Sequence, residues 1–165
     1  MVKETTSIEV RFTDVDSQNH VNHIAIIEWI AHARVRLIDG KIKQYDHGQW
    51  KNNDEEPELD HVLVNLDINF HKEVLYPGIV EISGRVLNVG SKSVTTEFFV
   101  YSNDDLSAEA QCTNVFFRTS DKKSVNIPNQ LKDILMNKNG GNMVTKQIVS
   151  SKLVPLRMVQ PNTND

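Results

Sequence analysis

The chain has 165 residues, enough for one domain with a hydrophobic core, and 39% of them are hydrophobic, as is ordinary for a globular protein. The formal net charge is −4 and no cluster of Lys and Arg stands out, which argues against nucleic acid or an anionic membrane as the main partner. There is no apolar stretch typical of a signal peptide or a bilayer span, and the single cysteine, Cys112, excludes an internal disulfide, so we expect a cytoplasmic protein.

The first predicted elements are a strand and a long helix. Residues 7–13 alternate, with Ile8, Val10 and Phe12 on one face, which is strand periodicity. After a polar stretch, an apolar run follows that is too long for one ordinary strand. Gly40 is a plausible stop, so we predict a helix from about Asn22 to Asp39.

This helix is apolar almost all round. Its polar positions Glu28, His32 and Arg36 recur every four residues and form one narrow stripe, typical of a face toward water or a partner. Arg34 lies away from that stripe and would need a partner if buried. A helix of this kind is normally enclosed, so we expect a sheet to wrap it on more than one side.

The remaining core is predicted to be β structure. The polar, acidic residues 46–60 predict a surface loop. Strands then follow with short turns at Pro77–Gly78, Gly90–Ser93 and Asn103–Asp105, which predicts an antiparallel sheet. The expected strands cover an alternating run of apolar residues from Val62 to Phe70, then residues 79–89, a run from Val94 to Val100, and residues 107–118. The fold class is therefore α+β.

A short helix is predicted after Pro128, which is tolerated in a first helical turn. The run Lys138–Asn142 contains two glycines and predicts a break. We expect one domain over residues 1–137 and a tail over residues 138–165 that is flexible or packs on a partner subunit.

The segment Arg11–His23 is the best candidate for chemistry, because it joins a strand end to the start of the long helix. Backbone N–H groups at a helix N-terminus carry partial positive charge and can bind an oxygen that becomes negative during a reaction. A carboxylate, imidazoles and amides beside them fit an acyl-transfer site. The same residue types are also common helix caps, so a purely structural capping loop is the alternative.

The motif Asp14-Val15-Asp16-x-x-Asn19-His20-Val21-Asn22-His23, followed by Glu28-Trp29 and Arg34, resembles the 4-hydroxybenzoyl-CoA thioesterase family of hot-dog proteins. It is also similar to the corresponding motif of the plant acyl-ACP thioesterases. The resemblance runs over about residues 6–136. It implies a hot-dog fold, in which a curled antiparallel sheet of about five strands wraps a long central helix.

The resemblance also implies roles for individual residues. Asp16 would act as general base or as nucleophile on the thioester carbonyl, and the backbone N–H of His23 would polarise that carbonyl. His20 and Asn22 match the family's His and Asn, as a catalytic and a substrate-binding residue. Gln18 stands where the acyl-ACP group has a functional Asn.

Two further positions depart from the family pattern. Asn19 replaces the usual Gly, and Asn tolerates the backbone angles that Gly often supplies, while His23 replaces the second Asn. In relatives the turn that matches Ser91-Lys92-Ser93 lies near the CoA phosphates, so these residues are substrate-binding candidates. An exposed hairpin lysine is the alternative for Lys92. Asp14 is expected to hold the loop by hydrogen bonds.

The first functional hypothesis is hydrolysis of an acyl-CoA thioester to a free acid and CoA, by a homodimer or homotetramer with its sites between subunits. No metal or prosthetic group is expected, and CoA enters as part of the substrate. The alternatives are a non-catalytic acyl-CoA or fatty-acid binding module, an acyl-ACP thioesterase, and an enoyl-CoA hydratase, for which no motif is visible. A zinc site at Asp16, His20 and His23 lacks a strong signature, and Cys112 is interpreted as structural.

Overall fold

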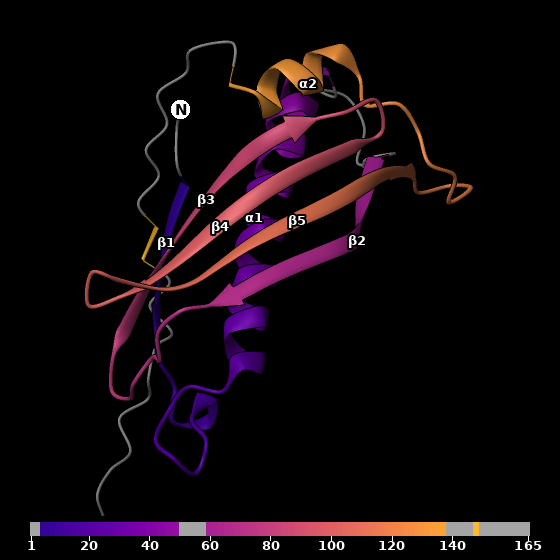
Figure 1. Cartoon of the computed structure of the whole chain (residues 1–165). Helices are drawn as coiled ribbons and strands as arrows, with labels where there is room; N and C mark the ends of the chain where they lie inside the picture. The colour runs from indigo at the N-terminus through magenta and orange to yellow at the C-terminus, as the bar shows by residue number, and fades with distance from the viewer. Residues whose placement is uncertain (1–3, 50–58, 138–146, 149–165) are drawn as a thin grey trace, which may run out of the picture.

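The computed structural model describes residues 4–49, 59–137 and 147–148. A long helix lies behind a twisted sheet, and a second, short helix sits at one end of the molecule (Figure 1). The elements in chain order are β1 (Glu4–Glu9), the 3-10 helix η1 (Phe12–Asp14), α1 (His23–Gln49), β2 (Leu59–Phe70), β3 (Ile79–Val89), β4 (Ser93–Ser102), β5 (Asp105–Arg118), α2 (Asn129–Leu135) and β6 (Gln147–Ile148).

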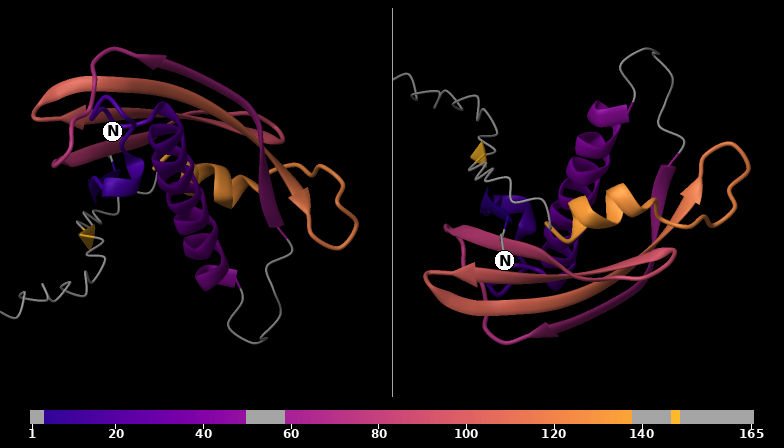
Figure 2. Two further views of the ribbon diagram at one scale, coloured as in Figure 1. Left: turned by 90° about the horizontal axis from the view of Figure 1, so that it is seen from below. Right: turned by 90° about the horizontal axis from the view of Figure 1, so that it is seen from above.

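The sheet has the strand order β2-β5-β4-β3-β1-β6, and every pair among β1 to β5 is antiparallel. It curls so that α1 lies in its hollow, and α2 packs beside α1 at one end (Figure 2). Short hairpins join β3 to β4 and β4 to β5, as predicted; at the second, Asn103 and Asp104 adopt positive φ angles of 51° and 66°. The predicted α+β layout is confirmed.

α1 is longer than predicted. It runs through Gly40 to Gln49, so its last residues occupy part of the predicted loop over residues 46–60; Leu59 and Asp60 begin β2, and residues 50–58 lie outside the described part. A mid-helix Gly costs about 1 kcal/mol relative to Ala. Ile38 and Ile42 are buried on both sides of Gly40, and this packing keeps the helix going.

Within the described residues, part of the α1 surface is left uncovered. The helix buries a stripe at three- and four-residue spacing, but Ile24 and Val35 on the other side are 61% and 38% exposed. The predicted wrapping of the helix by a curled sheet is confirmed, and the exposed residues show where the described part of the chain leaves α1 uncovered. Arg34 is 9% exposed, and its Nε has no hydrogen-bond partner among the described residues.

β2 contains a bulge that changes which side chains face the core. The pairing with β5 skips Val64, between Leu63 and Asn65. A bulge adds one residue and therefore shifts the alternation by one. Val62 and Val64 are 49% and 57% exposed, whereas Leu66 and Ile68 pair with the buried Cys112 and Ala110. The prediction of a strand is confirmed, but its apolar residues do not share one face.

The N-terminal strand is shifted from the predicted residues 7–13 to Glu4–Glu9. Val10 is buried, but the chain then turns into η1, which leaves the Phe12 side chain 77% exposed. At the opposite chain end, two residues of the predicted tail form β6 and pair in parallel with Thr6 and Ser7 of β1. The rest of the tail lies outside the described residues.

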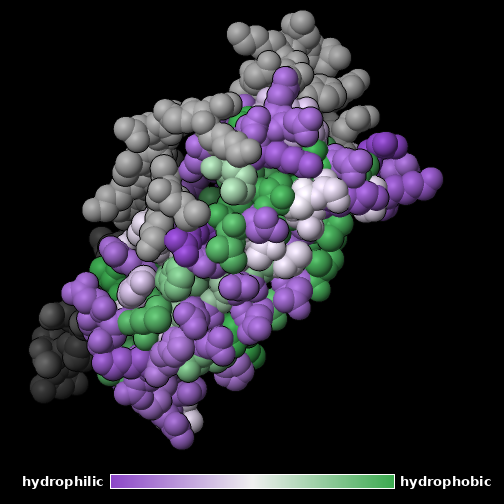
Figure 3. All heavy atoms as spheres, turned by 45° about the horizontal axis from the view of Figure 1, so that its top comes forward, coloured by the Kyte–Doolittle hydropathy of each residue, from purple (hydrophilic) through white to green (hydrophobic). Residues whose placement is uncertain are grey.

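Polar and apolar residues share the face of the molecule on the sheet side (Figure 3). In the sheet, Glu97 of β4 lies opposite Arg85 of β3 and Gln111 of β5. Arg85 and Glu97 form an ion pair, which satisfies the mostly buried carboxylate. In the part of the chain that the structure describes, no helix has the length and apolar character needed to cross a membrane.

Candidate functional site

The loop between β1 and α1 is held by a buried aspartate. Asp14 is 3% exposed, and its carboxylate accepts hydrogen bonds from the Arg11 backbone N–H at 2.8 Å and from Arg11 Nη2 at 2.7 Å. The carbonyl of Asp14 accepts the Asn22 N–H at 2.7 Å. Asp14 therefore fixes both ends of the loop, and the predicted structural role is what its contacts support.

Asp16 lies in a tight turn within this loop. The turn closes through Asn19, whose N–H donates to the Asp16 carbonyl at 3.1 Å and whose φ is 63°, the conformation for which Asn can replace Gly. Asp16 Oδ1 accepts the N–H groups of Gln18 at 2.8 Å and His20 at 3.1 Å. Oδ2 has no hydrogen-bond partner among the described residues, so half of this exposed carboxylate is free to act.

The start of α1 also leaves one group free. The Asn22 side chain caps the helix by accepting the Ile24 N–H at 2.8 Å, and the Asn22 carbonyl accepts the N–H of Ala25 at 3.0 Å. The N–H of His23 has no acceptor within the described residues. It points out from the positive end of the helix dipole, where an anionic oxygen is favoured.

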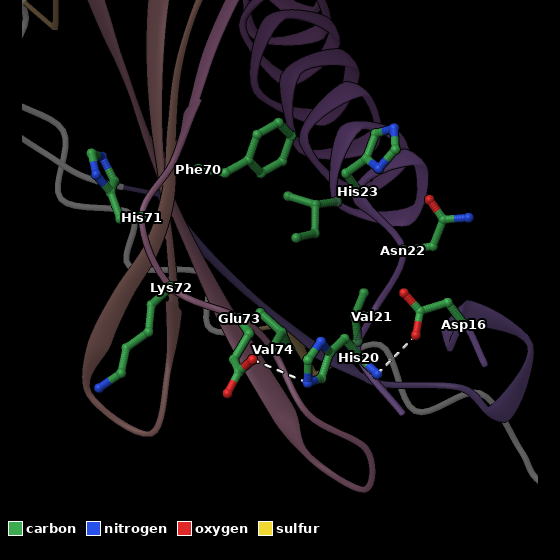
Figure 4. Close-up of a pocket in the computed structure, with 11 residues that line it drawn as sticks. Asp16, His20, Val21, Asn22, His23, Phe70, His71, Lys72, Glu73 and Val74 are labelled. Atoms are coloured by element: carbon green, nitrogen blue, oxygen red, sulfur yellow. Dashed lines mark hydrogen bonds and ion pairs between the residues drawn. The ribbon is translucent and has the colours of Figure 1, made fainter. Parts of the chain in front are cut away.

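These groups open into a crevice of about 500 Å³ between the start of α1 and the end of β2. Asp16, His20, Asn22 and His23 lie on one side of it, and Phe70 and Glu73 lie on the other (Figure 4). The remaining lining residues are Val21, Ile26, His71, Lys72 and Val74. The crevice thus combines an apolar floor with a carboxylate, two imidazoles and a free N–H.

The two walls of the crevice are tied together. The Val21 N–H donates to the Val74 carbonyl at 2.8 Å, and His20 forms an isolated β-bridge with Leu75. His20 Nε2 lies 3.1 Å from Glu73 Oε2. The His23 and Phe70 rings meet edge to face, with centroids 6.1 Å apart.

Not every predicted site residue lies at the crevice. Gln18 contributes its backbone N–H to the Asp16 turn, but it does not line the cavity. Ser91, Lys92 and Ser93 form the turn after β3, a strand of 11 residues that spans on the order of 30 Å. This turn lies at the end of the sheet away from the start of α1 (Figure 1). Lys92 Nζ contacts Ser124 Oγ at 3.3 Å there.

The metal site and the cysteine considered in the sequence can now be compared with the structure. Within the described residues, no three His, Cys, Asp or Glu side chains are grouped closely enough to hold a metal ion. Cys112 is 1% exposed, and burial raises the pKa of its thiol to about 11. The neutral thiol is a poor nucleophile, which favours the structural interpretation.

The sequence profile of the thioesterase-like superfamily matches residues 10–135, a span that contains the whole crevice. The chain belongs to this superfamily. A search of curated proteins finds no match.

Solved structures share the fold of this thioesterase-like chain. A predicted thioesterase from Bacillus stearothermophilus superposes with a TM-score of 0.69 at 17% identity, over 82% of this chain and 96% of that one. The probable thioesterase YbaW from Escherichia coli superposes with a TM-score of 0.66 at 20% identity, over 80% of this chain and 96% of that one. A 1,4-dihydroxy-2-naphthoyl-CoA thioesterase from Synechocystis superposes with a TM-score of 0.66 at 12% identity, over 85% of this chain and 100% of that one. The predicted hot-dog fold is confirmed.

Sequence reasoning missed the second wall of the crevice. Phe70 was expected only as a strand residue, and Glu73 and Val74 were not singled out. The available signal was the position of residues 70–74, which lie between a strand and the Pro77–Gly78 turn. Only the three-dimensional pairing of Val10 with Gly78 and of Val21 with Val74 brings this segment to the start of α1.

Proposed function

We propose that this protein hydrolyses an acyl-CoA thioester to a carboxylic acid and CoA. One observation carries the proposal: the free carboxylate oxygen of Asp16 and the free N–H of His23 lie in the same crevice at the start of α1. Hydrolysis of a thioester needs a base or nucleophile on one side of the carbonyl and a donor for its developing negative charge.

The geometry of Asp16 suits this role. Two backbone N–H groups hold Oδ1, so the carboxylate has a fixed orientation and Oδ2 is the reactive oxygen. Oδ2 takes a proton from an attacking water or attacks the carbonyl itself; both routes fit a thioester, whose carbonyl is already electrophilic. The His23 N–H donates to the carbonyl oxygen and is aided by the helix dipole.

The apolar part of the crevice suits an acyl group. Val21, Ile26 and Val74 line its base, and Phe70 presents an aromatic ring beside His23. Burying an acyl chain against such residues contributes roughly 0.8 kcal/mol per CH₂ group. In this proposal no metal or prosthetic group takes part, and CoA enters as part of the substrate.

A second copy of the chain would complete the site. Among the described residues, β2 is a 12-residue strand with no neighbour on one edge, and Val62 and Val64 on it are about half exposed. Long edge strands with exposed apolar residues favour pairing with another strand. We infer a homodimer or homotetramer, in which Ser91, Lys92 and Ser93 of one copy approach the crevice of another and bind the CoA phosphates.

The rival functions are a non-catalytic acyl-CoA binding module and an acyl-ACP thioesterase. We would measure free-thiol release from a panel of acyl-CoAs and acyl-ACPs of different chain lengths, and binding of the same ligands by calorimetry. Thiol release from at least one acyl-CoA supports the proposal. Binding without thiol release would establish the binding module instead. Thiol release from acyl-ACPs alone would make the substrate an acyl-ACP rather than an acyl-CoA.

A further inference from the structure

A second carboxylate faces the crevice. Glu73 follows β2 and lies across from the Asp16 loop, with Oε2 3.1 Å from His20 Nε2 (Figure 4). The two side chains are 55% and 39% exposed. An exposed ion pair of this kind contributes little to stability, with a typical range of about 0–1 kcal/mol. Stability alone is therefore a weak reason for the pair.

The backbone already holds the two segments together without this pair. The Val21 N–H bonds to the Val74 carbonyl, and His20 bridges to Leu75. The contact between Glu73 and His20 adds something that the backbone does not: it fixes the direction of the imidazole. His20 Nδ1 has no hydrogen-bond partner in the described part of the chain, so one ring nitrogen is held and the other is free.

The charges around His20 single out Glu73 as its partner. From the loop side, Asp16 Oδ1 accepts the His20 backbone N–H rather than the ring. From the other wall, Lys72 pairs with Asp105 at 2.5 Å and His71 pairs with Glu109 at 3.3 Å, and both side chains are directed away from His20 (Figure 4). Glu73 is thus the carboxylate that meets the imidazole.

We propose that Glu73 is a positioning residue that holds His20 as the proton donor for the leaving thiolate; this inference rests on the proposed thioester hydrolysis. Water's oxygen bonds to the acyl carbon, and one of its protons passes to Asp16, which afterwards releases it to solvent. The carbon–sulfur bond breaks, and the sulfur takes a proton from Nδ1 of the His20 imidazolium while Glu73 keeps the Nε2–H. His20 regains a proton from solvent through its exposed side.

The test is the pair of substitutions Glu73→Gln and His20→Ala, singly and together, in the full-length protein. Gln keeps the size and an acceptor oxygen but removes the charge. We expect kcat to fall about tenfold in Glu73→Gln and about 100-fold in His20→Ala, with KM within about twofold. Once His20 is gone, Glu73→Gln should have no further effect.

Glu109→Gln is the matched control, because Glu109 also pairs with a histidine at similar exposure but does not itself line the crevice. It should leave kcat unchanged. The ¹⁵N signal of His20 Nε2 should change in Glu73→Gln, and this readout does not depend on activity. A hydrolysing wild type with an unaltered kcat in Glu73→Gln would overturn this inference alone. A wild type that hydrolyses no thioester would overturn the proposed function with it.

Discussion

Two histidine–carboxylate pairs bridge from the α1 side of the molecule to the β2 side, and they differ in what surrounds them. At one end of β2, His61 Nε2 lies 3.0 Å from Asp39 Oδ1 of α1, and its Nδ1 accepts from Asn114 Nδ2 at 2.9 Å. Its side chain is 4% exposed. At the other end, His20 uses one ring nitrogen on Glu73 and is 39% exposed.

The difference separates a structural pair from the pair that we propose to be reactive. The chain Asp39–His61–Asn114 has the residue types of a catalytic relay, but both ring nitrogens are occupied and the ring is closed off from solvent. Within the described residues, His20 has a free ring nitrogen and access to water, and it neighbours Asp16, whose Oδ2 has no hydrogen-bond partner. The candidate site is therefore distinguished by a ring nitrogen without a hydrogen bond and by exposure to solvent, rather than by residue type.

The largest expected effect on stability comes from the buried pair. His61→Ala leaves the Asn114 amide and the Asp39 carboxylate without their partner and creates a cavity. We expect the free energy of unfolding to fall by about 3 kcal/mol, since buried polar groups that lose their partners cost roughly 1–3 kcal/mol each. Urea denaturation measures it, and kcat of the folded fraction should stay within about threefold. An unchanged unfolding midpoint would break the comparison.

The open pair should show the reverse behaviour. His20→Ala removes an exposed ion pair, so we expect the free energy of unfolding to change by less than about 1 kcal/mol. The loss of kcat expected above should occur with the unfolding curve almost unchanged. The comparison would be wrong if His20→Ala lost stability to the same degree as His61→Ala in the same denaturation experiment.

Asp39→Asn tests the buried pair more gently. The Asn oxygen can still accept the His61 Nε2–H, and the Asp39 side chain is 45% exposed, so water can satisfy the rest. We expect a loss of about 1 kcal/mol or less in the free energy of unfolding. A loss as large as that of His61→Ala would mean that the negative charge, rather than the hydrogen bond, holds the pair.

The smallest expected change concerns the thiol close to the buried pair. Because burial raises the Cys112 pKa to about 11, the thiol stays protonated at pH 8 and should resist alkylation in the native state. The thiol ionises more readily in the unfolded chain than in the folded one. The free energy of unfolding is therefore unaffected by this thiol below about pH 8.5 and falls as the pH rises from there toward 11. Rapid labelling at pH 8 without denaturant, measured by mass spectrometry, would contradict the burial.

Much of the fold was predictable because the governing signals are local. Alternating apolar residues, short turns and the helix start at Asn22 lie within a few residues of each other in the sequence. The exceptions have identifiable causes. Packing of Ile38 and Ile42 overrides Gly40 as a helix stop, and the bulge at Val64 depends on pairing with β5 rather than on the local pattern.

The sequence predicts one of the two walls of the candidate site. The motif from Asp16 to His23 supplied one wall, together with the interpretation of Asn19 as a Gly replacement and of Asp14 as structural. The other wall comes from residues after β2, and no local pattern indicates that Glu73 meets His20. The approach of Ser91–Ser93 also stays a prediction, because it requires a second copy of the chain.

The most direct test of the account is the rate of acyl-CoA hydrolysis by Asp16→Asn compared with wild type, with Asp67→Asn as a control for an exposed carboxylate on β2. Asn keeps an oxygen that accepts the Gln18 and His20 N–H groups, so the turn is preserved while the reactive carboxylate is lost. We predict a fall in kcat of at least about 100-fold in Asp16→Asn and no change in Asp67→Asn. Equal rates in wild type and Asp16→Asn would contradict a catalytic role for this carboxylate.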